Sequence, residues 1–446
     1  MTEQHSQPDG RRPGTSGARR RRRWRKVSLL ALVALAVVLV AALASRAPMA
    51  FPGRAQGERP QRMPRVLVSD VQAADEPQEQ PAAQPAETVT VRLMMVGDIL
   101  MHSSVIDSGR QADGSLAYDH LFAPLAADIA EADVAVLNQE TILGGSSWPY
   151  TGYPTFNSPQ EVGDAEAAAG FDVILKATNH TLDLGYDGVR AELAYWASAH
   201  PEVAVIGMAD PDGDGICPAG GTSPAGAYVY EKDGLRIALL NYTDVLNGNV
   251  DPAHDGRVVS VMSEEGVRAD VAAARERADI VVVFAHWGEE YETVPTESER
   301  HWADVLCEAG ADVVIGGHPH VIQPVEVLGE GDDRMLVCWS VGNFVSTQLG
   351  AANMVGGMVR IDFVKDARGA RVGEYAFIPT VTQREGGTAG ITAYKLADYT
   401  DELAARSPIS SIDGGNGATA AWYADYCAQV LGDAFDRETA SVHGSL

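Results

Sequence analysis

Histidines in this sequence lie close together behind paired glycines. His318 and His320 are one residue apart in the stretch GGHPHVIQPVE, after Gly316 and Gly317. Pro319 biases the residue before it toward an extended backbone, and side chains at i and i+2 of an extended chain project on the same side. We therefore expect both imidazoles to face one site, where the glycines let another group approach the backbone closely.

Further polar residues follow short apolar runs elsewhere in the chain. The full set is Asp98, His102, Glu140, Asn179, His180, His286, His318 and His320. Each residue alone is more often a hydrogen-bonded or capping residue than a ligand. Together they would bury carboxylates beside imidazoles, which is costly without a cation.

The types of these groups indicate the kind of metal. Imidazole nitrogen with carboxylate and amide oxygen, and no thiolate, suits Mn, Fe, Zn, Co or Ni rather than Ca or an iron–sulfur cluster. The groups outnumber the ligands of a single tetrahedral catalytic site. Two divalent ions, Mn, Fe or Zn above all, would use them. Such ions lie about 3.5–4 Å apart, clamp the attacking and leaving oxygens of an in-line displacement, and lower the pKa of a bound water to about 7.

Apolar runs rich in Val, Ile and Leu lead into these polar clusters and predict strands. The runs are TVTVRLMMV, DVAVL, FDVILKA, LRIALL, DIVVVFA, ADVVI and LVCWSV. Continuous runs of this length are typical of strands buried on both faces, as in sheets covered by helices. The stretches between them predict helices at Ser158–Gly170, Tyr186–His200, Glu264–Arg277 and Thr296–Ala309. The class is therefore α/β, in which ligand sites gather at the carboxyl ends of strands.

The last hundred residues have a different pattern. Gly356–Val364 and Glu374–Gln383 predict a pair of strands, and Lys365–Arg371 would turn between them. Ala418–Phe435 predicts a closing helix. We divide the folded part into a main domain at residues 88–350 and a β-rich extension at residues 351–446 that packs on the same domain.

The first 87 residues lie outside this core. Residues 1–26 form a basic tail, and residues 27–45 contain an unbroken apolar run, about long enough to cross a bilayer, which needs roughly 17–25 residues. The basic tail is expected to stay in the cytoplasm, so that a single-pass anchor in the cell membrane places the rest outside. Cleavage after Ala42-Leu43-Ala44 would instead give a secreted protein. Residues 46–87, rich in Pro, Ala, Gln and Glu, predict a disordered tether.

Charge and cysteine content limit the partners. Beyond residue 46 the chain holds 24 basic and 59 acidic residues, a net charge of −35. Such a domain does not bind nucleic acid through its overall field, and it repels a polyanion unless the site is locally positive. The four cysteines lack CxxC spacing, which excludes a zinc ribbon. Cys217 with Cys427 is the disulfide we expect in an exported protein.

Six motifs, in order along the chain, resemble the CapA family. They are Gly97-Asp98-Ile99-Leu100-Met101-His102, Asn138-Gln139-Glu140, Thr178-Asn179-His180, His286-Trp287-Gly288-Glu289-Glu290-Tyr291, Gly317-His318-Pro319-His320-Val321 and Ser340-Val341-Gly342-Asn343-Phe344. This family belongs to the calcineurin-like metallophosphoesterase superfamily and is associated with poly-γ-glutamate capsule synthesis. The resemblance implies a four-layer sandwich of two mixed β-sheets flanked by helices, as in metallophosphatases.

The resemblance also implies roles for individual residues. The residues that match metal ligands are Asp98, His320 and, in a shifted position, His102 for the first ion; Asn179, His286 and His318 for the second; and Glu140 between the two. His180 matches the histidine that stabilises the transition state or protonates the leaving group, and Asp183 would orient it. Thr181 stands where the superfamily usually has an acidic residue.

The function implied by the resemblance is assembly, export or anchoring of poly-γ-glutamate outside the cell, together with other capsule-synthesis membrane proteins. The implied chemistry is hydrolysis of a phosphoester or related bond. Two alternatives remain. The protein would be a non-catalytic metal-binding subunit of a capsule assembly or export complex, or a cell-surface phosphoesterase acting on nucleotides or teichoic acid.

Overall fold

The computed structural model describes residues 88–213, 227–249, 258–331, 333–386, 389–411 and 418–446. The basic tail, the apolar run at 27–45, the tether at 46–87 and Cys217 lie outside the described residues. Contacts divide the chain into Met1–Pro81 and Ala82–Leu446, and only the second unit contains described residues. No helix within them has the length and apolar character needed to cross a membrane.

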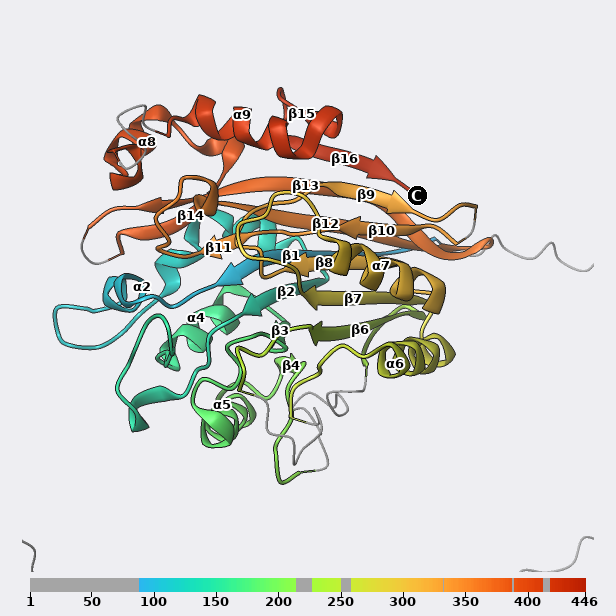
Figure 1. Cartoon of the computed structure of the whole chain (residues 1–446), viewed down its shortest axis with the longest axis horizontal. Coiled ribbons are helices and arrows are strands. Elements are labelled where there is room, and N and C mark those ends of the chain that lie inside the picture. The colour runs from blue at the N-terminus through green and yellow to red at the C-terminus, as the bar shows by residue number, and fades with distance from the viewer. Residues whose placement is uncertain (1–87, 214–226, 250–257, 332, 387–388, 412–417) are drawn as a thin grey trace, which may run out of the picture. The chain divides into compact units, whose positions relative to one another are not determined.

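Two mixed β-sheets form the centre of the described part of the chain (Figure 1). The strands of the 10-stranded sheet are β1 (Val89–Ile99), β2 (Val134–Gln139), β3 (Val173–Leu175), β4 (Ala204–Ile206), β11 (Asn343–Val345), β12 (Val355–Asp366), β13 (Gly369–Arg384), β14 (Ile391–Lys395), β15 (Phe435–Asp436) and β16 (Ser441–Ser445). The strands of the 6-stranded sheet are β5 (Tyr228–Lys232), β6 (Leu235–Thr243), β7 (Ile280–His286), β8 (Val313–Gly317), β9 (Val325–Leu328) and β10 (Met335–Cys338). β1 to β4 run parallel in the first sheet, as do β6, β7, β8 and β10 in the second.

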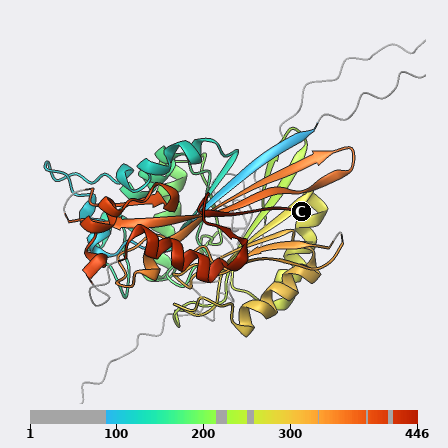
Figure 2. The same cartoon turned by 90° about the horizontal axis from the view of Figure 1, so that it is seen from above.

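Helices flank the two sheets. Those of the first half of the chain are α2 (Ser103–Ser108), α3 (Ala126–Ala130), α4 (Glu161–Ala169) and α5 (Gly185–Ala199). Those of the second half are α6 (Glu264–Arg277), α7 (Glu297–Ala309), α8 (Asp401–Arg406) and α9 (Ala420–Leu431). Short 3-10 helices lie at Asp119–Leu121, Ala123–Leu125, Gly145–Ser147, Ala352–Met354, Leu396–Asp398, Pro408–Ser411 and Gly432–Ala434. Figure 2 shows α6 and α7, in yellow, on the opposite side from α4 and α5, in green.

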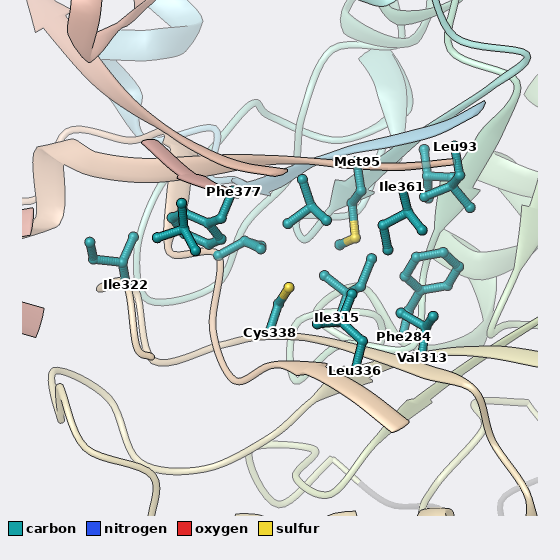
Figure 3. Packing of buried hydrophobic residues seen from close by; sticks show 14 of the residues in the cluster. Leu93, Met95, Phe284, Val313, Ile315, Ile322, Leu336, Cys338, Ile361 and Phe377 are labelled. Atoms are coloured by element: carbon teal, nitrogen blue, oxygen red, sulfur yellow. The ribbon is translucent and has the colours of Figure 1, made fainter. Parts of the chain in front are cut away.

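The two sheets face each other across one apolar core. Leu93 and Met95 of β1 point into this core, whereas Met94 and Val96 point toward the helices on the other side. This alternation follows from the period of two of a strand. Figure 3 shows Leu93 and Met95 opposite Phe284 of β7. The central strands β1, β2, β7 and β8 are thus buried on both faces, because a sheet covers one face and helices cover the other.

The outer helices bury separate apolar clusters. Trp196 of α5 packs on the outer face of the 10-stranded sheet, and Leu306 of α7 packs on the outer face of the 6-stranded sheet. Helix, sheet, sheet and helix therefore follow one another as layers. The expected mixed α/β fold with two mixed sheets and flanking helices is confirmed in this form.

The expected elements are largely confirmed, with three main differences at their ends. The seven apolar runs form β1, β2, β3, β6, β7, β8 and β10. The helix expected from Ser158 begins at Glu161, because Ser158 instead donates its N–H to the carbonyl of Ile142 (2.9 Å). The turn after β12 is shorter than expected, since β13 already begins at Gly369, where φ is +111°. The closing helix expected to reach Phe435 ends at Leu431.

The expected disulfide is not formed at Cys427. Within the described part of the chain, this cysteine has a free thiol. Its side chain is buried in α9 and belongs to the same apolar cluster as Tyr423 and Leu431. Burial among apolar groups raises the pKa of the Cys427 thiol to about 12, so it behaves here as a small apolar side chain.

The contact between the sheets should dominate stability. Replacing Phe284 by Ala removes a buried ring from the shared core and is expected to lower the free energy of unfolding by about 3–5 kcal/mol. The control is Val327→Ala in the same sheet, at a side chain that is 40% exposed, where a change of less than about 0.5 kcal/mol is expected. Urea unfolding of the purified protein measures both. Equal losses in the two variants would contradict the assignment of the core.

Candidate metal centre

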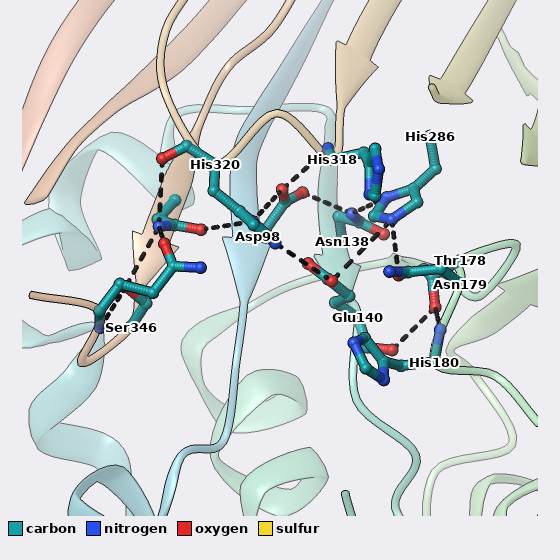
Figure 4. Close-up of polar contacts among 12 residues, drawn as sticks. Asp98, Asn138, Glu140, Thr178, Asn179, His180, His286, His318, His320 and Ser346 are labelled. Carbon is teal, nitrogen blue, oxygen red and sulfur yellow. Dashed lines mark hydrogen bonds and ion pairs between the residues drawn. The ribbon is translucent and has the colours of Figure 1, made fainter. Parts of the chain in front are cut away.

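Polar side chains from both sheets meet at the carboxyl ends of β1, β2, β7 and β8 (Figure 4). Asp98 of β1 lies beside Asn138 of β2, and His286 at the end of β7 lies beside Gly317 at the end of β8. Glu140 directly follows β2. The sheets approach closely here because Gly317 has no side chain: a Cβ at this position would lie 2.7 Å from Oδ1 of Asp98.

Asp98, Glu140 and His286 form the innermost group. One ligand atom of each lies within 4.8 Å of the others, and all three residues are buried. His320 is adjacent: its Nδ1 is 3.5 Å from Oδ2 of Asp98 and its Nε2 is 3.7 Å from Oε1 of Glu140. The Nε2 of His286 is 3.9 Å from the same Oε1. One carboxylate oxygen of Glu140 therefore has an imidazole from each of two different segments within 4 Å.

His318 and His320 reach the centre through a bent backbone. Their φ angles are +93° and +57°, in the left-handed region that residues with a side chain rarely adopt. The prediction of an extended segment is therefore wrong. Both rings still lie at the site, since the ring centroid of His318 is 4.8 Å from that of His286 and 5.9 Å from that of His320.

A hydrogen bond to Asp98 accompanies this bend and overrides the local effect of Pro319. The N–H of His318 donates to Oδ2 of Asp98 (3.0 Å). Each residue held in such a sparsely populated region costs about 1–3 kcal/mol, and such strain is concentrated at functional sites. The two glycines before His318 allow other parts of the protein to approach the backbone closely. The side chain of Asp98 lies against Gly317, and the backbone carbonyl of Trp339 lies against Gly316.

Two asparagines that the sequence patterns did not assign as site residues hold the ligands in place. Nδ2 of Asn138 donates to Oδ1 of Asp98 (2.6 Å) and lies 3.3 Å from Nδ1 of His286. Oδ1 of Asn343, which pairs with Asp98 between β1 and β11, accepts from Nδ1 of His320 (3.0 Å). This bond orients Nε2 of His320 toward Glu140, as a hydrogen bond to the other ring nitrogen of a metal-binding histidine commonly does. Both asparagines belong to strand-end clusters, so the same pattern could have found them.

Asn179 and His180 extend the centre on the side of His286. Oδ1 of Asn179 lies 3.0 Å from Nε2 of His286. Nδ1 of His180 lies 2.8 Å from Oδ2 of Asp183, and the same oxygen accepts the N–H of Phe156 (2.7 Å). Because a carboxylate accepts, Nδ1 of His180 carries a proton, and Nε2 is the ring nitrogen that can exchange one.

His102 lies beside the centre but outside the innermost group. Its Nδ1 accepts the N–H of Thr347 (3.3 Å), and its ring meets Phe156 edge-on with centroids 5.5 Å apart. Burial and the charge of His320 lower the pKa of His102 to about 4. One ring nitrogen of His102 is engaged by the backbone.

The electrostatics of the centre fit a bound cation. Neither carboxylate oxygen of Glu140 nor Nδ1 of His318 has a hydrogen-bond partner among the described residues. Burial raises the pKa of Glu140 well above its usual value, lowers the pKa of His286 well below its own, and lowers that of His318 to about 4. Burial alone would lower the pKa of His320, but the carboxylates of Glu140 and Asp98 outweigh burial and raise this pKa to about 9.

These shifts have one physical origin. Oxygen and nitrogen lone pairs are collected in a buried place, where such groups either avoid charge or acquire an opposite charge nearby. A divalent cation would accept these lone pairs. The mixture of carboxylate, amide and imidazole groups suits a borderline metal.

Fold and site together define an α/β protein whose two sheets meet at a candidate divalent-metal centre. The family described as bacterial capsule synthesis protein PGA_cap matches residues 92–348, which is more than half of the chain and includes all the site residues described above. The chain therefore belongs to this family, and the resemblance to CapA proteins is confirmed.

Individual relatives match over shorter stretches. The PGA biosynthesis protein CapA of Bacillus subtilis (strain 168) is 31% identical over 179 residues, 40% of this chain and 43% of that protein. The capsule biosynthesis protein CapA of Bacillus anthracis is 27% identical over 271 residues, 59% of this chain and 61% of that protein. The matches thus span less than two thirds of either relative.

Among solved structures, the chain is similar to NAD nucleotidase (NadN) of Haemophilus influenzae, with a TM-score of 0.40 and 13% identity over 66% of this chain and 56% of that chain. It is also similar to a putative 5'-nucleotidase from Staphylococcus aureus, with a TM-score of 0.40 and 14% identity over 69% of this chain and 54% of that chain.

Metal binding depends on His318 if this centre is assigned correctly. Replacing His318 by Ala removes an imidazole beside His286 and is expected to weaken the affinity for Mn²⁺ or Zn²⁺ by at least about 10–100-fold, the loss typical even of outer-shell partners. Metal analysis after equilibrium dialysis measures it. The control is His301→Ala, at an exposed histidine of α7 whose Nε2 lies 3.2 Å from Glu264. Equal metal content in the wild type and both variants would contradict the assignment.

Proposed function

We propose that this chain is a metal-dependent hydrolase of the metallophosphoesterase type that acts in the synthesis, export or anchoring of a poly-γ-glutamate capsule. Family membership supports the capsule role, because the relatives that match are a PGA biosynthesis protein and a capsule biosynthesis protein. The buried group of Asp98, Glu140 and His286 supports the metal dependence. The substrate bond is a phosphoester or a related electrophile.

The position of Glu140 carries the proposal of two ions. Its Oε1 is 3.9 Å from His286 and 3.7 Å from His320, and both of its oxygens lack a hydrogen-bond partner among the described residues. A carboxylate between two sets of imidazoles is the arrangement that a bridging ligand requires.

Two sets of residues would hold the ions, Mn, Fe or Zn. Asp98 and His320 would hold one, and Asn179, His286 and His318 the other. Such a pair supplies an activated water at neutral pH and polarises the phosphoryl oxygens.

His180 is the proposed acid of the reaction. Asp183 holds its Nδ1 (2.8 Å) and is itself held by the N–H of Phe156 (2.7 Å), so the direction of the ring is fixed from two sides. Nε2 would then stabilise charge on the substrate or deliver a proton to the leaving oxygen. Thr181, which replaces the acidic residue usual at this place, donates its hydroxyl to the carbonyl of Thr178 (3.0 Å). Asp183 makes the contact to the histidine instead.

In this proposal the apolar segment at 27–45 anchors the protein in the cell membrane, and residues 46–87 connect it to a domain outside the cell. Partners would be poly-γ-glutamate and other capsule-synthesis membrane proteins, without nucleic acid. The net charge of −35 beyond residue 46 opposes capture of a free polyanion. Contact with a polymer would therefore depend on the local positive charge that bound cations provide.

Hydrolysis of bis-p-nitrophenyl phosphate by the purified protein with added Mn²⁺ tests the enzymatic part. His180→Ala is expected to lower kcat by about 10²–10⁴-fold while the metal content stays unchanged, because His180 is not assigned as a ligand. His443→Ala, at an exposed histidine of β16, is the control and should leave both quantities unchanged.

A second candidate is a non-catalytic metal-binding subunit of a capsule assembly or export complex, which the departure at Thr181 favours. Metal binding in the wild type without turnover by any of Mn²⁺, Fe²⁺ or Zn²⁺ would support this reading and refute the hydrolase. If turnover is found, a product screen with nucleotides and teichoic acid separates a capsule role from a general cell-surface phosphoesterase.

A further inference from the structure

A fully buried ion pair lies next to the segment that carries Glu140. Lys176, which follows β3, and Glu192 of α5 are both 0% exposed, and Nζ of Lys176 is 3.3 Å from Oε1 of Glu192. Buried ion pairs contribute little net stability, because desolvation offsets their attraction. Since neither side chain reaches the surface, neither can contact a substrate directly.

The pair holds the backbone on both sides of Glu140. Nζ of Lys176 donates to the carbonyl oxygens of Gln139 (2.7 Å) and Thr141 (3.0 Å). Oε2 of Glu192 accepts the N–H of Leu143 (2.8 Å). One cation and one anion therefore hold carbonyl and amide groups of the same short segment, Gln139–Leu143.

The carbonyl of Glu140 itself is held from the same neighbouring segment. It accepts the hydroxyl of Thr178 (2.8 Å), two residues after Lys176 and directly before Asn179. Three consecutive carbonyls, 139 to 141, are thus bound by side chains of one segment, which also carries His180. This arrangement sets the position of Glu140 relative to the loop of Asn179 and His180.

The chemistry of lysine fits this place closely. Its ammonium group has three donors, and three acceptors surround it: two backbone carbonyls and the carboxylate of Glu192. Glu166, a further buried carboxyl group that interacts with Lys176 and Glu192, has a pKa that burial raises well above the usual value.

We propose that Lys176, paired with Glu192, is a positioning residue of the metal centre: it fixes the backbone around Glu140 so that its carboxylate stays between His286 and His320. The carboxylate of Glu140 needs such support, because both of its oxygens lack a hydrogen-bond partner among the described residues. The proposal rests on the proposed role of Glu140 as a metal ligand.

A double variant separates positioning from a purely structural role. Lys176→Met alone leaves the charge of Glu192 buried and unpaired, which itself destabilises a protein. Lys176→Met combined with Glu192→Gln removes both charges at similar volume, and such replacements of a buried pair are often neutral for stability. We therefore expect this double variant to fold, with an unfolding midpoint lowered by the loss of the donor to the carbonyls of Gln139 and Thr141. The destabilised control below accounts for such a loss.

Two measurements on the full chain test the proposal. Hydrogen exchange of the EDTA-treated protein is expected to be at least about tenfold faster in the double variant at residues 139–143, and unchanged in β7. Titration with Mn²⁺ is expected to give a Kd at least about tenfold higher in the double variant, the scale of an outer-shell loss. The control is Val271→Ala in α6, a buried residue on the outer face of the other sheet, which lowers stability but should change neither quantity.

The outcomes distinguish this proposal from the proposed function. If the wild type binds Mn²⁺ and the double variant binds it equally well, Lys176 does not position the centre. If the wild type binds none of Mn²⁺, Fe²⁺ and Zn²⁺, the proposed function fails, and hydrogen exchange alone decides. An unchanged rate at residues 139–143 then overturns the proposal, and a faster rate retains Lys176 as the residue that fixes this segment. An equal Kd shift in Val271→Ala would also overturn it.

Discussion

Burying the carboxylates of Asp98 and Glu140 where the two sheets meet is the constraint on which the site depends. Both side chains are 0% exposed, and an ionised carboxylate away from water is costly unless it is paired. Asp98 is supplied with an amide from Asn138 and an N–H from His318. The carboxylate of Glu140 has imidazoles within 4 Å, but neither of its oxygens has a hydrogen-bond partner in the described part of the chain. Because the carboxylate of Glu140 lacks the hydrogen bonds that Asp98 has, a bound cation would compensate its buried charge.

The fold produces this meeting point through parallel strands. β1 with β2, and β7 with β8, run parallel and end at the same edges, so residues distant in the chain arrive together. A glycine at the end of β8 lets the two sheets touch at Asp98. Hydrogen bonds hold the backbone of His318 and His320 at positive φ angles: the N–H of His318 donates to Asp98, and the carbonyl of His320 accepts from Nδ2 of Asn343. The contact between His318 and Asp98 thus both holds the strained backbone of His318 and provides the buried carboxylate of Asp98 with a hydrogen-bond donor.

Family membership and the geometry of the centre support one another in different ways. The match to the capsule synthesis family covers residues 92–348 and gives the biological setting, whereas the side chains suggest the chemistry. A site that collects imidazoles and carboxylates in an otherwise strongly acidic chain suits a role in which metal ions, rather than surface lysines, provide positive charge. The ion pair of Lys176 and Glu192 indicates that buried residues, which cannot contact a ligand, also help to organise the site.

The amino-acid sequence by itself determined the elements and the chemical types at their ends. Apolar runs are a local property, so β1, β2, β7, β8 and the capped helix α7, with Thr296 and Glu299 in a capping box, could be predicted closely. The types of polar side chain at the strand ends could be predicted for the same reason. The tertiary structure alone decided the bend at His318, the supporting roles of Asn138 and Asn343, and the position of Lys176. These depend on contacts such as that between His318 and Asp98, 220 residues apart, and no local pattern encodes which distant group a backbone N–H or a buried amine will find.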